Sequence, residues 1–229
     1  EGMSSKKVIV ALDSNNLKKT LNLVKILKKD VYAFKIGYQF FFNFGLDGYR
    51  KIYSICPKIF LDLKLHDIPN TVKNGLEGLL KIKPLLTTIH ICGGDKMMKA
   101  SKIKNKFTKI LGVSILTSLD SKQTKKYYNQ KNVFKLVKEF SKAAKNNKLD
   151  GVVCSPKEIE YIRKEVGKNF IIITPGIRID NKIKGDDQKR VETPSRAIEM
   201  GADFLVIGRP ITESKNPLQT LKEINKTLS

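Results

Sequence analysis

The chain has 229 residues, a formal net charge of +22 and 41% hydrophobic residues, which describes a globular protein with enough chain to form a sizeable core. No apolar run approaches the roughly 20 residues that a membrane-spanning helix needs, so a membrane protein is excluded. Cys56, Cys92 and Cys154 are odd in number and lack CxxC spacing, which argues against a disulfide framework or zinc site and fits a reducing cytoplasm.

The positive charge comes mainly from lysine, because only six of the 44 basic residues are arginine. The lysines are scattered, and aromatic residues do not alternate with them as they do in RNA-binding motifs. We therefore expect no dedicated nucleic-acid site. A general attraction for anionic substrates remains.

Eight short runs rich in β-branched residues predict strands. They span residues 6–12, 31–37, 58–64, 86–92, 109–116, 150–155, 170–176 and 203–209. Apolar residues at helical spacing lie between them, for example Leu17, Leu21, Val24 and Leu27, or Val133, Leu136, Val137 and Phe140. This alternation implies a parallel sheet with helical crossovers, and eight units favour a single-domain (β/α)₈ TIM barrel over an open doubly wound sheet.

The chain shows no linker that would divide this barrel. Glu1 and Gly2 precede Met3 and resemble a remnant of an expression tag, so the barrel domain is expected over residues 3–229. One connection, residues 175–192, is polar and too long for an ordinary loop between a strand and a helix. We interpret it as a mobile lid.

The stretch DLKLHD, residues 62–67, places charges at the end of an expected buried strand. Side chains alternate across a regular strand, so Asp62 and Lys64 should share one face while Leu61, Leu63 and Leu65 share the other. Opposite charges about 4 Å apart at an effective dielectric of about 20 attract by roughly 4 kcal/mol. The stretch therefore predicts either a structural ion pair or a catalytic group.

Other polar residues follow the remaining strand ends, where the active site of a barrel of this kind lies. They are Asp13, Lys35, Thr117, Ser118, Arg178, Gly208 and Arg209. In this fold the loops after the seventh and eighth strands commonly hold a phosphate through backbone amides and arginine. We therefore expect a phosphorylated substrate.

Purely structural interpretations remain open for several of these residues. Asp67 could cap the helix that begins near Pro69, and Asp13 could cap the helix that begins near Asn16. Lys35 could extend from a strand end into solvent, and the arginines could be solvated loop residues. His66 and His90 are expected to be structural, since no third metal ligand has suitable spacing.

Several segments in order along the whole chain resemble the bacterial type of the orotidine 5′-phosphate decarboxylase family. They are VIVALD (8–13), FKIG (34–37), DLKLHDIPNT (62–71), HxxGG (90–94), LTS (116–118), TPGIR (174–178), GDDQKR (185–190) and GADFLVIGRPI (201–211). Each fragment alone is moderately specific, and their common order makes the resemblance specific.

The resemblance implies a role for each matching residue. Lys64 would be the catalytic lysine, held between Asp62 and Asp67. Asp13 and Lys35 would bind the ribose hydroxyls, and Thr117, with Ser118 as the alternative, would contact the pyrimidine. The phosphate would be held by four residues, namely Arg178, Gln188, Gly208 and Arg209.

The resemblance also implies the reaction. It is the decarboxylation of orotidine 5′-monophosphate to uridine 5′-monophosphate, the last step of de novo pyrimidine synthesis, without a metal or other cofactor. Asp67 and Thr71 would reach the neighbouring subunit's site, which implies a homodimer. The cysteine usage noted above places the expected enzyme in the cytoplasm.

Two other functions are compatible with parts of the pattern. Sugar-phosphate enzymes of the same superfamily share a D-x-K-x-x-D motif but use magnesium, whereas IPNT and LTS favour the nucleotide substrate. A lysine-rich nucleic-acid-binding protein on an inactive barrel is the second alternative. Tolerance of a chelator tests the first alternative, and salt-dependent binding without turnover would favour the second.

Overall fold

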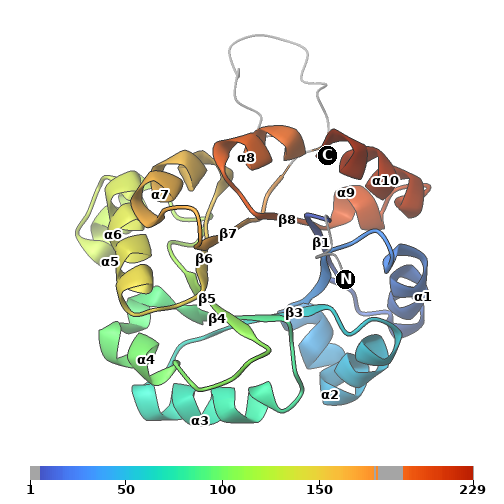
Figure 1. Ribbon diagram of the computed structural model, residues 1–229, viewed down its shortest axis with the longest axis horizontal. Coiled ribbons are helices and arrows are strands. Elements are labelled where there is room, and N and C mark those ends of the chain that lie inside the picture. The colour runs from blue at the N-terminus through green and yellow to red at the C-terminus, as the bar shows by residue number, and fades with distance from the viewer. Residues whose placement is uncertain (1–5, 178, 180–192, 229) are drawn as a thin grey trace. The chain divides into compact units, whose positions relative to one another are not determined.

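The computed structural model describes residues 6–177, 179 and 193–228, and these contain eight β-strands. The strands form a closed barrel in chain order, and each pairing for which a register is given is parallel (Figure 1). They are β1 Val8–Ala11, β2 Ala33–Ile36, β3 Ile59–Leu65, β4 Leu86–His90, β5 Lys109–Val113, β6 Gly151–Val153, β7 Ile171–Thr174 and β8 Phe204–Ile207. The predicted barrel is confirmed, and each strand overlaps its predicted range.

Helices connect successive strands in the part of the chain that the structure describes. They are α1 Leu17–Leu27, α2 Tyr38–Ile55, α3 Pro69–Leu80, α4 Asp95–Ala100, α5 Ser121–Tyr128, α6 Val133–Asn146, α7 Ile159–Val166, α8 Pro194–Met200, α9 Arg209–Thr212 and α10 Pro217–Thr227, with short 3₁₀ turns η1 Ile91–Gly93 and η2 Pro156–Glu158. Among these residues, no helix is both long and apolar enough to cross a bilayer.

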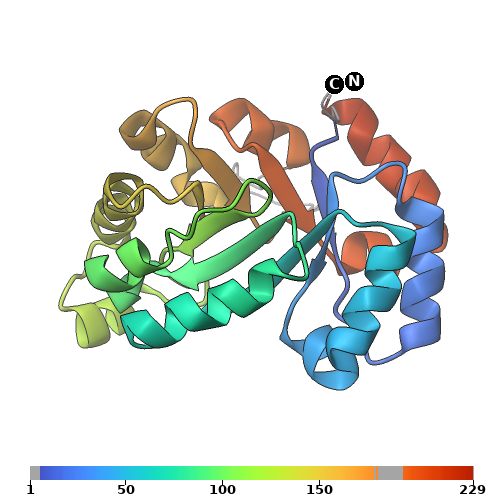
Figure 2. The same ribbon diagram turned by 60° about the horizontal axis from the view of Figure 1, so that its bottom comes forward.

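Within the barrel the chain forms two compact units, of which the first comprises residues 1–62 and 174–229. In it β1 pairs with β2 on one side and with β8 on the other, so that Val10 is level with Phe34 and with Ile207. These three side chains are almost fully buried. Helix α1 packs against α2 and α10 on the outside of these strands (Figure 2).

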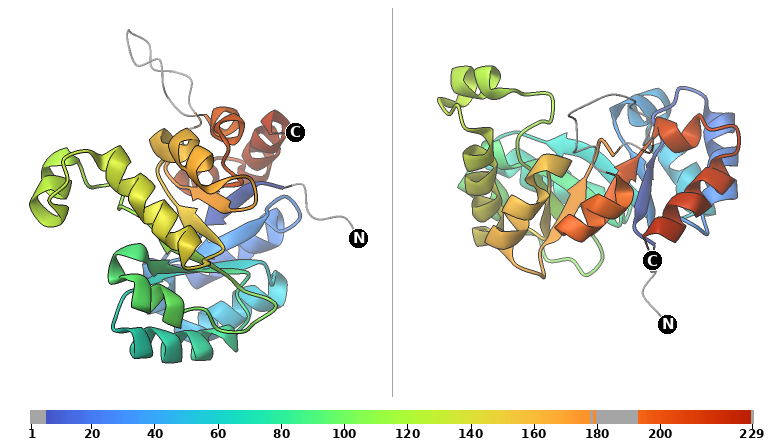
Figure 3. Two further views of the ribbon diagram at one scale, coloured as in Figure 1. Left: turned by 60° about the vertical axis from the view of Figure 1, so that its left-hand side comes forward. Right: turned by 90° about the horizontal axis from the view of Figure 1, so that it is seen from above.

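The second unit comprises residues 63–173 and contains β4 to β7. Gly112 of β5 pairs with Ile89 of β4 and with Val152 of β6. Gly151 lies so close to the backbone of Ile171 in β7 that no side chain would fit there, which allows these two strands to approach. Figure 3 shows α5 at the outer end of α6, away from the strands of this unit.

Candidate functional site

Three of the predicted site residues lie together in the first unit. The Nζ of Lys35, on β2, lies 3.4 Å from the Oδ2 of Asp62, on β3. Both side chains are largely buried, with 16% and 8% of their surfaces exposed. A Cβ built on Gly37 would lie 3.5 Å from the Lys35 Nζ and 3.7 Å from the Asp13 Oδ1, so Asp13 approaches the same point.

The sheet register accounts for this grouping. Lys35 is level with Phe60 in the β2–β3 pairing, so the long lysine side chain reaches Asp62 farther along β3. Burial strengthens the attraction between the two charges because little water screens them. Lys35 and Asp62 therefore form a largely buried ion pair between β2 and β3.

Lys64 has an unusual backbone conformation for a lysine. Its φ is +48°, in the left-handed region that residues other than glycine rarely occupy. Such a conformation costs on the order of 1–3 kcal/mol and persists only where the surroundings impose it. Asp62 and Lys64 were predicted to share a face because side chains alternate along a regular strand. The left-handed backbone interrupts this alternation at Lys64.

Thr88 of β4 holds this backbone in place. The amide of Lys64 donates a hydrogen bond of 3.0 Å to the Oγ1 of Thr88, which is fully buried. The sequence analysis did not identify Thr88, although a threonine inside a buried strand was a visible signal. Its hydroxyl fixes the position from which the lysine side chain begins.

The loop after β3 carries Asp67 and leads into α3, whose first turn carries Thr71. Asp67 is exposed, and its Oδ1 accepts a hydrogen bond of 2.7 Å from the amide of the next residue, Ile68. Ile68 is itself the N-cap of α3, and no side chain caps this helix. The interpretation of Asp67 as a helix cap is therefore wrong, and its carboxylate and the exposed Thr71 face solvent in this chain.

Asp13 does not cap a helix either. The N-cap of α1 is Asn16, whose side chain accepts a hydrogen bond of 3.0 Å from the amide of Lys19. The structural interpretation of Asp13 is thus wrong, and its exposed carboxylate lies near Lys35 instead.

Thr117 and Ser118 form the centre of a turn after β5. The amide of Leu119 donates a hydrogen bond of 2.9 Å to the carbonyl of Leu116, which closes the turn. Both central side chains are exposed. The geometry therefore leaves both hydroxyls available and does not select Thr117 over Ser118.

Gly208 and Arg209 follow β8, and Arg209 begins α9 with an exposed side chain. A Cβ on Gly208 would lie 3.5 Å from the Cβ of Ala11, so the backbone at Gly208 runs close to β1. Arg178 and Gln188, and most of the predicted lid at 175–192, lie outside the described residues.

The two histidines pack against each other in the second unit, with ring centroids 5.3 Å apart. Within the described ranges, no group of three or more His, Cys, Asp or Glu side chains is arranged to hold a metal ion. All three cysteines are free thiols.

Glu158 is a buried carboxyl group that the sequence analysis did not identify. It is 7% exposed and follows β6 in the turn η2. Burial raises the pKa of Glu158 to about 7, although hydrogen bonds from Ser155 oppose that rise. Burial, and secondly the Glu158 charge, raise the pKa of the neighbouring Cys154 thiol well above its usual value, so this cysteine stays protonated.

We expect Glu158 to make folding stability dependent on pH. Because its pKa is higher in the folded state than in the unfolded chain, its stabilising contribution is complete below about pH 4.5 and is lost as the pH rises through about 7. The loss should be on the order of 3 kcal/mol. Urea unfolding between pH 5 and pH 8 should show this fall in the wild type and a flatter profile in Glu158→Gln. Parallel profiles for the two proteins would contradict the expectation.

Comparisons with known proteins identify the family of this chain. Residues 6–224 match the profile of the "Orotidine 5′-phosphate decarboxylase / HUMPS family". A relative named orotidine 5′-phosphate decarboxylase, from Wolbachia sp. subsp. Brugia malayi, is 41% identical over 224 residues, which cover 97% of this chain and 99% of the relative. One with the same name from Malacoplasma penetrans is 41% identical over 231 residues, covering 98% and 99%.

Solved structures agree as well. The crystal structure of orotidine 5′-phosphate decarboxylase from Lactobacillus acidophilus superposes with a TM-score of 0.85 at 35% identity, covering 98% of this chain and 100% of that one. With a family profile that covers nearly the whole chain and relatives of about 40% identity, the chain belongs to the orotidine 5′-phosphate decarboxylase / HUMPS family.

Proposed function

We propose that the protein converts orotidine 5′-monophosphate to uridine 5′-monophosphate and carbon dioxide without a cofactor, with Lys64 as the catalytic residue. This is the last step of de novo pyrimidine synthesis. The proposal rests on one observation at the end of β3. There Lys64 occupies a strained left-handed backbone conformation, two residues after the buried Asp62. Strain of this kind is typical of functional sites.

The chemistry requires a fixed cation beside C6 of the pyrimidine. When the bond between C6 and the carboxylate breaks, the electron pair stays on C6 as a carbanion that the ring cannot readily delocalise. The ammonium of Lys64 attracts this charge and then transfers a proton to C6, after which solvent reprotonates the amine. The Thr88 hydrogen bond suits this role, because it fixes the backbone from which the lysine side chain extends.

In this proposal the carboxylates of Asp62 and Asp67 hold the ammonium of Lys64 between them. Asp62 would also lie beside the substrate carboxylate, so that their repulsion falls as carbon dioxide leaves. The ion pair with Lys35 supports this role, since it fixes the position of the Asp62 carboxylate in a largely buried place.

The remaining residues would hold the nucleotide. Asp13 and Lys35 meet near Gly37 and would bind the ribose hydroxyls. Thr117, in the turn after β5, would contact the pyrimidine. The phosphate would be held by four residues, namely Gly208, Arg209, Arg178 and Gln188. Binding of the phosphate, far from C6, would supply binding energy to the transition state.

We also propose a cytoplasmic homodimer in which Asp67 and Thr71 complete the partner's site. Asp67 and Thr71 are exposed here, and the apolar side chain of Ile68 between them is 66% exposed. Covering Ile68 with a second subunit would remove apolar surface from water. Three free thiols are compatible with the reducing cytoplasm.

The proposed reaction is tested by following the absorbance of orotidine 5′-monophosphate with purified protein, with and without excess EDTA. We expect rapid turnover that EDTA does not change, because a lysine supplies both the charge and the proton. Sugar-phosphate enzymes that form an enediolate on magnesium should fail under the same treatment. No turnover by folded protein, or turnover that EDTA abolishes, would contradict the proposal and direct the search to sugar phosphates.

A further inference from the structure

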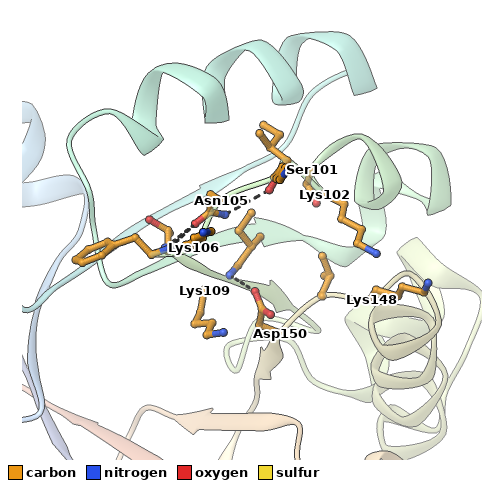
Figure 4. Close-up of a pocket in the computed structure, with 13 residues that line it drawn as sticks. Ser101, Lys102, Asn105, Lys106, Lys109, Lys148 and Asp150 are labelled. Carbon is orange, nitrogen blue, oxygen red and sulfur yellow. Dashed lines mark hydrogen bonds between the residues drawn. The ribbon is translucent and has the colours of Figure 1, made fainter. Parts of the chain in front are cut away.

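The second unit contains a pocket that none of the residues assigned above lines. It has a volume of about 420 Å³, within the range of small-molecule sites (Figure 4). Its lining comes from residues 101–110 and 148–150. Lys109 begins β5 and Asp150 precedes β6, so the pocket lies at the amino ends of these strands, whereas Thr117 follows the carboxyl end of β5.

Five lysines line this pocket. They are Lys102, Lys104, Lys106, Lys109 and Lys148, and all are exposed. None of them forms an ion pair with a carboxylate within the described part of the chain. On the neighbouring helices the pattern is different, because Lys138 and Lys142 both pair with Glu165.

The sequence leaves the four pocket lysines of residues 102–109 without an acidic residue in their own segment. Between Asp95 and Asp120 there are six lysines and no acidic residue. No carboxylate from this segment therefore offsets the repulsion between the ammonium groups. The carboxylate in the lining, Asp150, accepts a hydrogen bond of 2.8 Å from the amide of Ile110 through its Oδ2. In Figure 4, Lys109 and Lys148 lie on either side of Asp150.

The backbone that carries the lysines is held in place by internal hydrogen bonds. The Oδ1 of Asn105 accepts hydrogen bonds of 3.0 Å and 2.7 Å from the amides of Phe107 and Thr108. The buried Thr108 in turn donates a hydrogen bond of 2.6 Å to the carbonyl of Pro84. A fixed loop that presents flexible cations around a hollow loses little backbone entropy when an anion binds.

We propose that this pocket binds a linear oligophosphate, either free or as the triphosphate of a nucleotide. Each phosphate group carries charge that several ammonium groups can share, and the volume accommodates a short chain. A concave pocket of this size favours a compact anion over the extended backbone of a nucleic acid, which would need a continuous basic groove. The proposal does not depend on the decarboxylase activity, since no assigned site residue lines the pocket.

The test is isothermal titration calorimetry with sodium tripolyphosphate and, separately, with ATP at low ionic strength. Both ligands should bind the wild type, and the triple variant Lys102→Gln, Lys104→Gln, Lys106→Gln should bind them about tenfold more weakly. Stronger binding of ATP than of tripolyphosphate would identify a nucleotide as the source of the phosphates. Orthophosphate should bind more weakly than either, because it presents fewer charges to the pocket.

The matched control is a second triple variant, Lys18→Gln, Lys122→Gln, Lys222→Gln. It removes the same amount of charge from exposed lysines outside the pocket. This control should retain tripolyphosphate binding within about twofold, since only the general field changes. A second pocket variant, Lys148→Asn, removes one ammonium from a separate segment and suits the φ of +60° found there. It should weaken binding about threefold.

Three results would overturn the proposal. The first is that neither ligand binds the wild type. The second is that the triple variant and its control lose tripolyphosphate affinity equally. The third is that the triple variant loses binding to single-stranded DNA but binds tripolyphosphate normally. The last result would identify the lysines as a nucleic-acid surface. Because the variants leave the decarboxylase residues intact, their turnover of orotidine 5′-monophosphate serves as a measure of correct folding.

Discussion

Replacing Lys64 with alanine should lower kcat for orotidine 5′-monophosphate roughly 10⁴- to 10⁶-fold, because it removes both the proton donor and the cation that stabilises the carbanion. The measurement is the loss of substrate absorbance at saturating concentration, with enzyme concentrated enough to detect residual turnover. Alanine keeps a Cβ in the left-handed backbone, so the backbone strain at this position remains comparable.

The control for this prediction is Lys64→Gly, which should be equally inactive. Glycine adopts a φ of +48° without steric cost, which stabilises the folded state relative to alanine. The greater conformational freedom of glycine in the unfolded chain offsets part of this stabilisation. We therefore expect Lys64→Gly to exceed Lys64→Ala in free energy of unfolding by up to about 1 kcal/mol. Substantial turnover by folded Lys64→Ala would remove Lys64 from the mechanism, whatever the stability difference.

The shared site predicts that two inactive variants restore activity when they form one dimer. In a heterodimer of Lys64→Ala and Asp67→Ala, one site lacks both residues, whereas the other receives Lys64 from one chain and Asp67 from its partner. Co-expression with two different tags and tandem purification isolates this heterodimer. It should recover about one half of wild-type activity per dimer, because a two-fold dimer has two equivalent sites.

The matched control is a heterodimer of two differently tagged Lys64→Ala chains, which should stay inactive. An inactive Lys64→Ala/Asp67→Ala heterodimer of normal size would mean that each site uses its own Asp67. A protein that sediments as a monomer while turning over substrate would exclude the dimer proposal altogether.

The barrel could be predicted from the sequence because its signals are local and repeated. Each strand is a short β-branched run, and the helices between them keep apolar spacing, as in Leu17, Val24 and Leu27 of α1. The observed strands are mostly shorter than predicted, although the amides of Leu12 and Cys154, just beyond β1 and β6, still donate hydrogen bonds to the neighbouring strands. The eight-fold alternation itself was confirmed.

The details at the strand ends depended on contacts that a sequence pattern does not contain. The left-handed backbone of Lys64 accompanies a hydrogen bond to Thr88, which is distant in sequence, and regular alternation therefore failed at that residue. The structural alternatives, in which Asp13 and Asp67 cap helices, were wrong because Asn16 and Ile68 occupy the N-cap positions. The raised pKa of Glu158 follows from burial, which depends on the whole fold.

The backbone at Lys64 also has a consequence for protein engineering. A redesign that chooses residues only for compatibility with the backbone would favour glycine or asparagine at a φ of +48°. Such a procedure would improve the fold and, if Lys64 acts as proposed, remove the activity in one step. Position 64 should therefore be held constant in any attempt to make this barrel more thermostable.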